Sequence, residues 1–352
     1  MTTRIQRRTL LSGFASAALA SCTRGAGSRE GITVVSYGAG TYQESHRNAF
    51  LTPFTEQTQI ATTSAVWNAE YGRLRTMVET GDVGWDVVDV TAAQLARGKR
   101  DGILERINPL PETAGFLPGT IDEFGVGNVY WATVLAFDSN ASGPKPQSWA
   151  DFFDIRSFPG ARALYDDPRA NIEFALLASG VPKAELYPLT DDKVAEAFRR
   201  LSRIRDEVRV WWSDGSQPVQ LLMTGQVAMS SAWNGRIFAS PEAAARLRYP
   251  WNGAALELDY WVIPRGSRHA SEAAQFISFA SNPDRVATQV AAIGYGPANT
   301  NTLELLPENV RSSLPTYAQN FNVAFVVDPA SWEEREDELR TRWVSWRTTG
   351  RP

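Results

Sequence analysis

Few side chains in this chain have the types and the spacing that catalysis requires. Its two histidines, His46 and His269, lie far apart in the sequence, and neither belongs to a His-Glu-x-x-His pattern, which argues against a zinc site. The tripeptide DGS at 214–216 has aspartate where the Gly-x-Ser-x-Gly nucleophile elbow has its first glycine. We therefore expect no catalytic residue, no cofactor and no metal ion.

A glycine-containing turn, GAGTYQ at 38–43, follows the first β-rich run. It imitates the beginning of a dinucleotide-binding fingerprint, but Gln43 stands where the third glycine belongs, and a lone Gly-x-Gly is weak evidence for a nucleotide. We interpret the turn as a loop that approaches a ligand, with Gly40 and Tyr42 as candidate ligand-binding residues. A plain turn and a nicotinamide or flavin site are the alternatives.

The first 21 residues have the layout of an export signal: a basic start with three arginines, an apolar run over 9–21, and small residues before Cys22, the only cysteine. The apolar run is shorter than the roughly 20 residues that a membrane-spanning helix needs. The sequence RRTLL at 7–11 is similar to a twin-arginine signal, although ordinary secretory leaders also carry arginines.

The tetrapeptide LASC at 19–22 resembles a bacterial lipobox, in which the cysteine thiol receives a diacylglyceryl group and becomes the new N-terminus. We therefore predict lipid attachment at Cys22, against the alternative of a buried cysteine in an ordinary first helix. Residues 22–31 are small, polar and rich in glycine, which suits a flexible tether. The expected location is the periplasm or the outside of the cytoplasmic membrane, with the lipid as the only membrane contact.

The charge of the mature chain bears on its partners. The leader contains three arginines and no acid, so its removal takes the formal net charge from −4 to −7. An acidic exported protein is a poor candidate for nucleic acid or for anionic membrane surfaces, and a reasonable one for cationic solutes. No cysteine remains for disulfides, so a hydrophobic core must supply the stability.

Strand-like and helix-like segments alternate along the rest of the chain, which predicts an α/β fold with largely parallel sheets. About 320 residues exceed what one hydrophobic core usually serves, so we expect two lobes. The segments that read as strands are 32–37, 85–90, 130–137 and 259–264. Those that read as helices are 49–57, 92–101, 149–153, 169–179, 191–208 and 271–279.

Several motifs in the second half resemble the spermidine/putrescine-type family of extracellular solute-binding proteins. They are WWSDGSQ at 211–217, LLMTGQVAM at 221–229 and AWNGR at 232–236. The resemblance also covers 85–108, 165–180 and 256–299, including LDYWVIP and IGYGPAN, and so spans nearly all of the mature chain.

Members of that family are receptors of ATP-driven importers, and the predicted lipid anchor fits that role. The resemblance implies a type II-like periplasmic-binding-protein fold of two α/β lobes, hinged by crossing strands and closing on one small solute. On this basis we assign 32–136 plus 261–302 to lobe 1 and 137–260 plus 303–352 to lobe 2. The expected partners are the solute and a membrane permease, with the protein itself a monomer.

The resemblance also implies the ligand-binding residues. Trp233 would flank an alkyl chain or an ammonium group, and Asp259 would hold an amine through a charge-assisted hydrogen bond. Asp167 matches another acid of the family and Tyr295 an aromatic residue, and Thr91 completes the candidate set. The alternatives are core packing for Trp233, an exposed strand end for Asp259, and helix capping for Asp167.

This chain departs from the family at several positions. Many polyamine binders carry an aromatic platform near Ala93, an acid near Ala170 and a tryptophan near Glu257. In exchange, Arg236 follows the Trp-Asn-Gly motif where spermidine binders have a small residue. A cleft arginine repels a diamine and binds a carboxylate in bidentate fashion, unless it points outward or pairs with Glu257 or Asp259.

One acid for an amine and one arginine for a carboxylate describe an ω-amino acid such as γ-aminobutyrate. We therefore predict a receptor for a small amine-bearing or zwitterionic solute. A polyamine receptor is the first alternative. An exported cofactor-dependent oxidoreductase is the second, because twin-arginine export often serves proteins that load a cofactor before crossing.

Overall fold

The computed structural model describes residues 31–38 and 40–351. The export signal, the twin-arginine-like motif, Cys22 and all of the tether except Gly31 lie outside the described residues. Within the described part of the chain, no helix is both long and apolar enough to cross a membrane.

One continuous sheet runs through the molecule, with the strand order β2-β1-β3-β11-β6-β9-β7-β8. Its strands are β1 (Ile32–Tyr37), β2 (Thr62–Trp67), β3 (Val87–Thr91), β6 (Gly125–Asp138), β7 (Arg162–Tyr165), β8 (Val208–Trp212), β9 (Met229–Trp233) and β11 (Ala255–Pro264). The shorter strands β4 (Leu104–Glu105), β5 (Ile121–Asp122), β10 (Leu247–Arg248), β12 (Gly296–Pro297) and β13 (Phe325–Val326) pair with β6 or β11.

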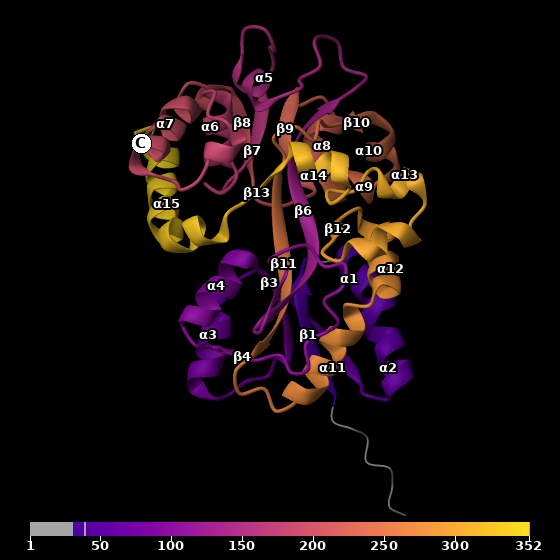
Figure 1. The fold of residues 1–352 in the computed structure, drawn as a ribbon. Helices are drawn as coiled ribbons and strands as arrows, with labels where there is room; N and C mark the ends of the chain where they lie inside the picture. The colour runs from indigo at the N-terminus through magenta and orange to yellow at the C-terminus, as the bar shows by residue number, and fades with distance from the viewer. Residues whose placement is uncertain (1–30, 39, 352) are drawn as a thin grey trace, which may run out of the picture.

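Helices cover both faces of the sheet (Figure 1). The longer ones are α3 (Tyr71–Thr80), α4 (Ala92–Arg100), α6 (Asn171–Ala178), α7 (Asp191–Ser202), α11 (Ala270–Ala280), α12 (Pro283–Ile293) and α15 (Pro329–Thr349). The shorter ones are α1 (Thr41–His46), α2 (Thr52–Thr58), α5 (Trp149–Phe153), α8 (Gln217–Met223), α9 (Asn234–Phe238), α10 (Pro241–Arg246), α13 (Glu308–Arg311) and α14 (Ala318–Val323). A π-helical segment (Arg47–Leu51) and three 3₁₀ segments (Lys183–Glu185, Arg205–Glu207 and Thr300–Leu305) complete the set.

The sheet is mixed rather than largely parallel. β1 pairs in parallel with β2 and β3, and β7 pairs in parallel with β8 and β9. Between these two groups, β11 is antiparallel to β3 and to β6, and β6 is antiparallel to β9. The expectation therefore holds within each outer group and is wrong at the centre, because two strands cross from one group to the other.

The crossing strands β6 and β11 run along the long axis of the molecule (Figure 1). In Figure 1, α1 to α4 and α11 lie at one end of them, whereas α5 to α10 and α15 lie at the other. This arrangement agrees with two lobes hinged by crossing strands. The predicted lobe boundaries stay a prediction.

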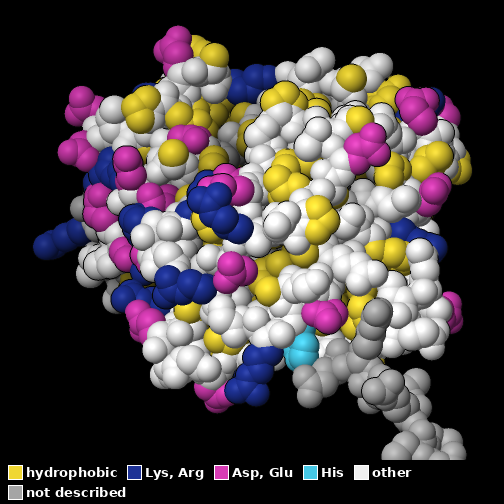
Figure 2. Space-filling view, turned by 60° about the horizontal axis from the view of Figure 1, so that its bottom comes forward, with side chains coloured by type: hydrophobic (Ala, Val, Ile, Leu, Met, Phe, Trp, Pro, Cys, Tyr) yellow, Lys and Arg dark blue, Asp and Glu magenta, His cyan; other side chains and the backbone are white. Residues whose placement is uncertain are grey.

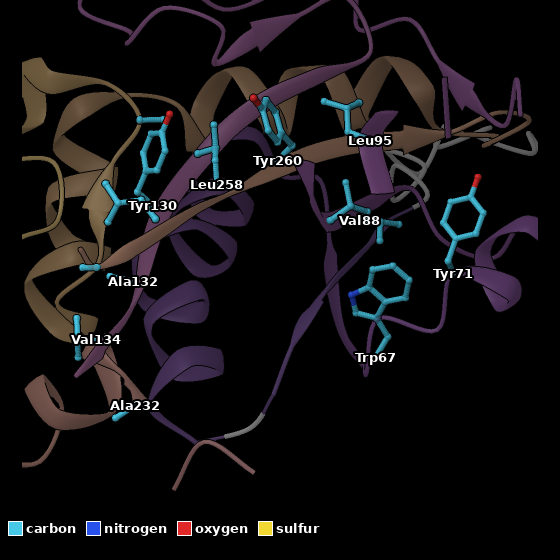
Figure 3. Packing of buried hydrophobic residues seen from close by; sticks show 14 of the residues in the cluster. Trp67, Tyr71, Val88, Leu95, Tyr130, Ala132, Val134, Ala232, Leu258 and Tyr260 are labelled. Carbon is cyan, nitrogen blue, oxygen red and sulfur yellow. The ribbon is translucent and has the colours of Figure 1, made fainter. Parts of the chain in front are cut away.

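Apolar side chains of the crossing strands form one core shared by the two ends. The paired strands β6 and β11 contribute buried side chains to this core: Tyr130, Ala132 and Val134 from β6, and Leu258 and Tyr260 from β11 (Figure 3). A second cluster of buried residues lies under α6, α7 and α15, and a third under α2 and α11. Each end therefore has its own core in addition to the shared one.

Helix α15 belongs to one end and reaches the other. Trp332, Trp343 and Trp346 anchor it, each at most 2% exposed. Its acidic side faces α4, where Arg97 lies 3.8 Å from Asp337 and Arg100 pairs with Glu333. These pairs join the two ends across the space between them.

On the face that Figure 2 shows, Lys and Arg side chains are interspersed with Asp and Glu among the described residues. Mixed signs of this kind favour solubility and give no single-sign field over that face.

Candidate ligand-binding cleft

A cavity of about 570 Å³ lies between the two ends, on the crossing strands. Its lining includes seven of the predicted ligand-binding residues: Tyr42, Thr91, Asp167, Trp233, Arg236, Asp259 and Tyr295. Gly40 is not in the lining, whereas Gly38, two residues earlier in the same turn, is. Residues far apart in the sequence therefore meet where β3, β6, β9 and β11 lie side by side.

Two carboxyl groups, Asp259 and Asp89, are both buried at the cavity: Asp259 lines it, whereas Asp89 lies outside the lining. Asp259 lies opposite Thr91 in the β11–β3 register, and Asp89 precedes Thr91 by two residues on the same face of β3. They are 3% and 0% exposed. Trp131 Nε1 donates to Asp259 at 3.1 Å, and the Tyr42 hydroxyl donates to Asp89 at 2.7 Å.

Among the described residues, neither carboxyl group has a Lys or Arg ion-pair partner, and Asp89 Oδ1 has no hydrogen-bond partner. Burial raises the pKa of Asp89 to about 7. Burial and then the nearby Asp89 charge raise the pKa of Asp259 well above its usual value. An organic ammonium ion would supply the missing counter-charge.

Aromatic rings form the walls around Asp259. Tyr37, Tyr42, Trp131, Trp233 and Tyr295 all line the cavity. Trp131 and Trp233 meet edge to face with ring centroids 5.8 Å apart, and those of Tyr42 and Tyr295 are 6.0 Å apart. Trp233 also packs against Tyr165 and Trp212, so core packing and a ligand-facing role coexist in this side chain. Such a box suits an alkyl chain that ends in an ammonium group.

Arg236 projects from α9, directly after β9. Its Nε atom is buried and has no hydrogen-bond partner. Two glycines make room for the guanidinium: a Cβ atom on Gly215 would lie 3.1 Å from Nε, and one on Gly38 would lie 3.5 Å from a terminal nitrogen. No ion pair joins Arg236 to Glu257 or Asp259 among the described residues, so the internal pairing considered above does not form.

Asp167 lines the cavity, but its carboxylate is already occupied. Arg340 of α15 donates to one oxygen, and the backbone N–H of Arg169 donates to the other at 3.0 Å. The capping alternative does not hold either, because the N-cap of α6 is Ala170 and no side chain caps it. An amine would have to compete with Arg340 for this acid, whereas Asp259 has no such competitor.

Sequence reasoning missed the ion pair between Arg169 and Glu257. Arg169 lies 3.3 Å from Glu257 and 2.8 Å from Glu336, and all three line the cavity. It also missed Asp89, although an acid inside the apolar run WDVVDV signals a buried charge. Of the departures, Ala170 lines the cavity and Ala93 is buried outside the lining.

No group of three or more His, Cys, Asp or Glu side chains in the described residues could hold a metal ion. The cleft therefore offers one unpaired acid, one unpaired guanidinium and aromatic walls, which are groups that bind a small charged molecule.

The chain was compared with known proteins. The family model described as bacterial extracellular solute-binding protein matches residues 49–334. The gamma-aminobutyric acid-binding protein of Pseudomonas aeruginosa is 37% identical over 321 residues, 90% of this chain and 91% of that protein. Spermidine/putrescine-binding periplasmic protein 1 of Haemophilus influenzae is 26% identical over 311 residues, 84% of this chain and 82% of that protein.

A solved structure of a GABA receptor has a TM-score of 0.83 and 31% identity, and the match covers 90% of this chain and 97% of that one. The structural likeness and the family match cover both ends of the molecule and the cleft between them. This chain belongs to the family of bacterial extracellular solute-binding proteins.

Proposed function

We propose that this chain is the substrate-binding lipoprotein of an ABC importer for an ω-amino acid such as γ-aminobutyrate. The observation that carries the proposal is the presence, in one aromatic cavity, of two groups that have no ion-pair partner among the described residues: the Asp259 carboxyl group and the Arg236 guanidinium, whose buried Nε atom also has no hydrogen-bond partner. The relative with 37% identity carries γ-aminobutyric acid in its name, which supports the same ligand class.

The two ends of such a ligand satisfy both groups. An ammonium group on Asp259 replaces lost hydration with charge-assisted hydrogen bonds, and a carboxylate on Arg236 accepts a two-pronged contact from the guanidinium. A diamine bound at Asp259 would leave its second ammonium facing the Arg236 cation. The site therefore favours a zwitterion over a molecule with two positive ends.

The remaining parts of the proposal concern anchoring and movement. Export followed by lipid attachment at Cys22 would place the protein outside the cytoplasmic membrane, bound to it by the lipid alone. A solute that contacts both lobes stabilises their closed arrangement, because its affinity for the open form is lower. A permease would then recognise the closed monomer. The oxidoreductase alternative receives no support from relatives, whose names are those of binding proteins.

A thermal-shift and calorimetry series tests the ligand class. Purified protein is measured with γ-aminobutyrate, putrescine, spermidine and glycine betaine. We expect stabilisation by γ-aminobutyrate, and its loss in Arg236→Met, which keeps an apolar stem but removes the carboxylate donor. Arg203→Met is the matched control, because Arg203 is an exposed arginine outside the cavity lining.

Stabilisation by spermidine alone, unchanged in Arg236→Met, would reject the ω-amino acid and support the polyamine alternative. Binding of the ω-amino acid by the Arg236→Met variant with unchanged affinity would show that Arg236 does not hold the carboxylate. Native mass spectrometry of freshly purified protein adds an independent check, because a retained ligand is identified by its mass.

A further inference from the structure

We propose that Arg169 determines specificity: it occupies Glu257, and so closes a second ammonium site that would otherwise let the cleft accept a diamine. The inference rests on the proposed function, because it assumes that an amine binds at Asp259. On this proposal, the Arg169 side chain excludes diamines from the cleft.

Arg169 is held firmly in the cavity wall. Its guanidinium lies 3.3 Å from Glu257 of β11 and 2.8 Å from Glu336 of α15, and its carbon Cζ lies 5.4 Å from the centre of the Trp332 ring. Only 12% of the side chain is exposed. A cation fixed by two acids and a ring does not swing away when a ligand enters.

Glu257 is well placed to serve a second amine. It precedes Asp259 by two residues on β11, and both side chains line the cavity. Two residues along a strand span roughly 6.6 Å, about the length of an extended four-carbon diamine. Without Arg169 the two acids would form a two-acid site for a diamine.

Removing Arg169 would leave this wall strongly acidic. Glu257, Glu336 and Asp167 line it, and the one arginine left beside them would be Arg340, which already contacts Asp167 and Glu336. Arg169 and Arg236 both line the cavity that holds Asp259, so a diamine anchored at this acid shares the cavity with two guanidinium cations. A zwitterion instead brings a carboxylate, which a guanidinium can bind.

The test compares Arg169→Met with Arg169→Lys. Both keep an unbranched stem against Trp332, but only Lys keeps the charge. Putrescine binding is measured by calorimetry over a series of pH values from about 7 to about 9. Burial raises the pKa of Glu257 to about 7 while the Arg169 charge lowers it, so this pKa is higher still in Arg169→Met and the carboxylate must be ionised to bind an amine. We expect Arg169→Met to gain putrescine affinity by about tenfold or more, the worth of one charge-assisted hydrogen bond. Arg169→Lys should gain none.

The double variant Arg169→Met with Glu257→Gln completes a double-mutant cycle. The gain in putrescine affinity seen in Arg169→Met must disappear in it, because the second acid has been removed. An unchanged putrescine affinity in Arg169→Met, an equal gain in Arg169→Lys, or a gain that survives Glu257→Gln would each overturn the inference. If Arg169→Met fails to fold, as judged by circular dichroism, Arg169→Gln takes its place. Failure of the wild-type protein to bind any ω-amino acid would instead reject the proposed function.

Discussion

The buried pair of Asp89 and Asp259 makes a quantitative prediction about protons. Two carboxyl groups this close, without a cation beside them, cannot both be ionised at neutral pH in the unliganded protein. Burial raises the pKa of both, that of Asp89 to about 7. An ammonium group that binds Asp259 requires the ionised form. Ligand binding must therefore release a proton.

The magnitude follows from linkage. When binding releases one proton, the association constant rises by up to about tenfold for each pH unit below the pKa and levels off above it. Between pH 5 and pH 7 the affinity should therefore increase by up to about 100-fold. The ligand contributes nothing to this slope, because its ends resemble Glu and Lys side chains, whose ordinary pKa values are about 4.3 and 10.4.

Other ionisable groups face this pair. Tyr37, Tyr42 and Tyr295 have pKa values raised by burial, and the pKa of His46 is lowered to about 3. They do not change charge between pH 5 and pH 7. Glu257, whose pKa is raised to about 7 by burial, and its partner Arg169 also act on Asp259. Glu257→Gln separates its contribution from that of the pair.

The assay is calorimetry of γ-aminobutyrate in phosphate and in Bis-Tris at the same pH. The two buffers differ in ionisation enthalpy, so the difference in observed heat counts the protons released. We expect about one proton near pH 6. Asp89→Asn should bind more tightly than wild type at low pH, because Asp259 then ionises more readily. Asp86→Asn, directly before the same strand and outside the cavity lining, is the matched control.

Equal heats in the two buffers, or an affinity that does not vary between pH 5 and pH 7, would refute the reasoning. The unliganded protein gives a second readout. A raised pKa in the folded state means that the folded protein binds more protons than the unfolded chain above pH 4, so its free energy of unfolding falls as the pH rises toward 7. The ligand-induced shift in Tm should accordingly be larger at neutral than at acidic pH.

Three further predictions concern single positions. Gly215→Ala places a Cβ atom 2.4 Å from the Trp233 ring, so ligand affinity should fall by about tenfold in calorimetry while circular dichroism stays unchanged. His46 is 1% exposed and burial lowers its pKa to about 3, so the neutral side chain costs the folded protein stability progressively as the pH falls below 6.5. Going from pH 7.5 to pH 5 in urea titrations, the free energy of unfolding of His46→Phe should rise by about 2 kcal/mol relative to that of wild type. Asp337→Asn removes the contact with Arg97 between α15 and α4, and should weaken ligand binding only a few-fold at low salt and not at all in about 1 M salt; an equal loss at both salt concentrations would contradict this role.

Short apolar runs made the outer strands predictable. The run at 32–37 is β1 as predicted, and the strand predicted at 85–90 is β3 displaced by about two residues. The crossing strands were predicted too short. β6 starts at Gly125, because its glycines allow a close backbone approach: a Cβ atom on Gly127 would lie 2.8 Å from the Thr120 carbonyl oxygen. In a sequence, a glycine suggests that a strand is interrupted, whereas Gly127 is needed here because the backbone packs closely against it.

Long-range partners explain the other differences. β11 starts before Asp259, at Ala255, because Glu257 is buried against Arg169, 88 residues earlier in the chain. Helix α7 ends at Ser202 and not near Val208, because Val208 begins a strand that pairs with β7. Motifs found most of the cavity lining. They could not show which acids are neutralised, because that depends on side chains that only the fold brings together.

The placement of Trp131 and Asp259 on the crossing strands has a kinetic consequence. Residues on the axis of a hinge move least during opening and closing, so the proposed closure of the two lobes would leave these two residues in nearly the same positions. The amine end of a solute can then dock first, before the lobes meet. Changes at the axis should alter the association rate constant, and changes where α4 meets α15 should alter mainly the residence time.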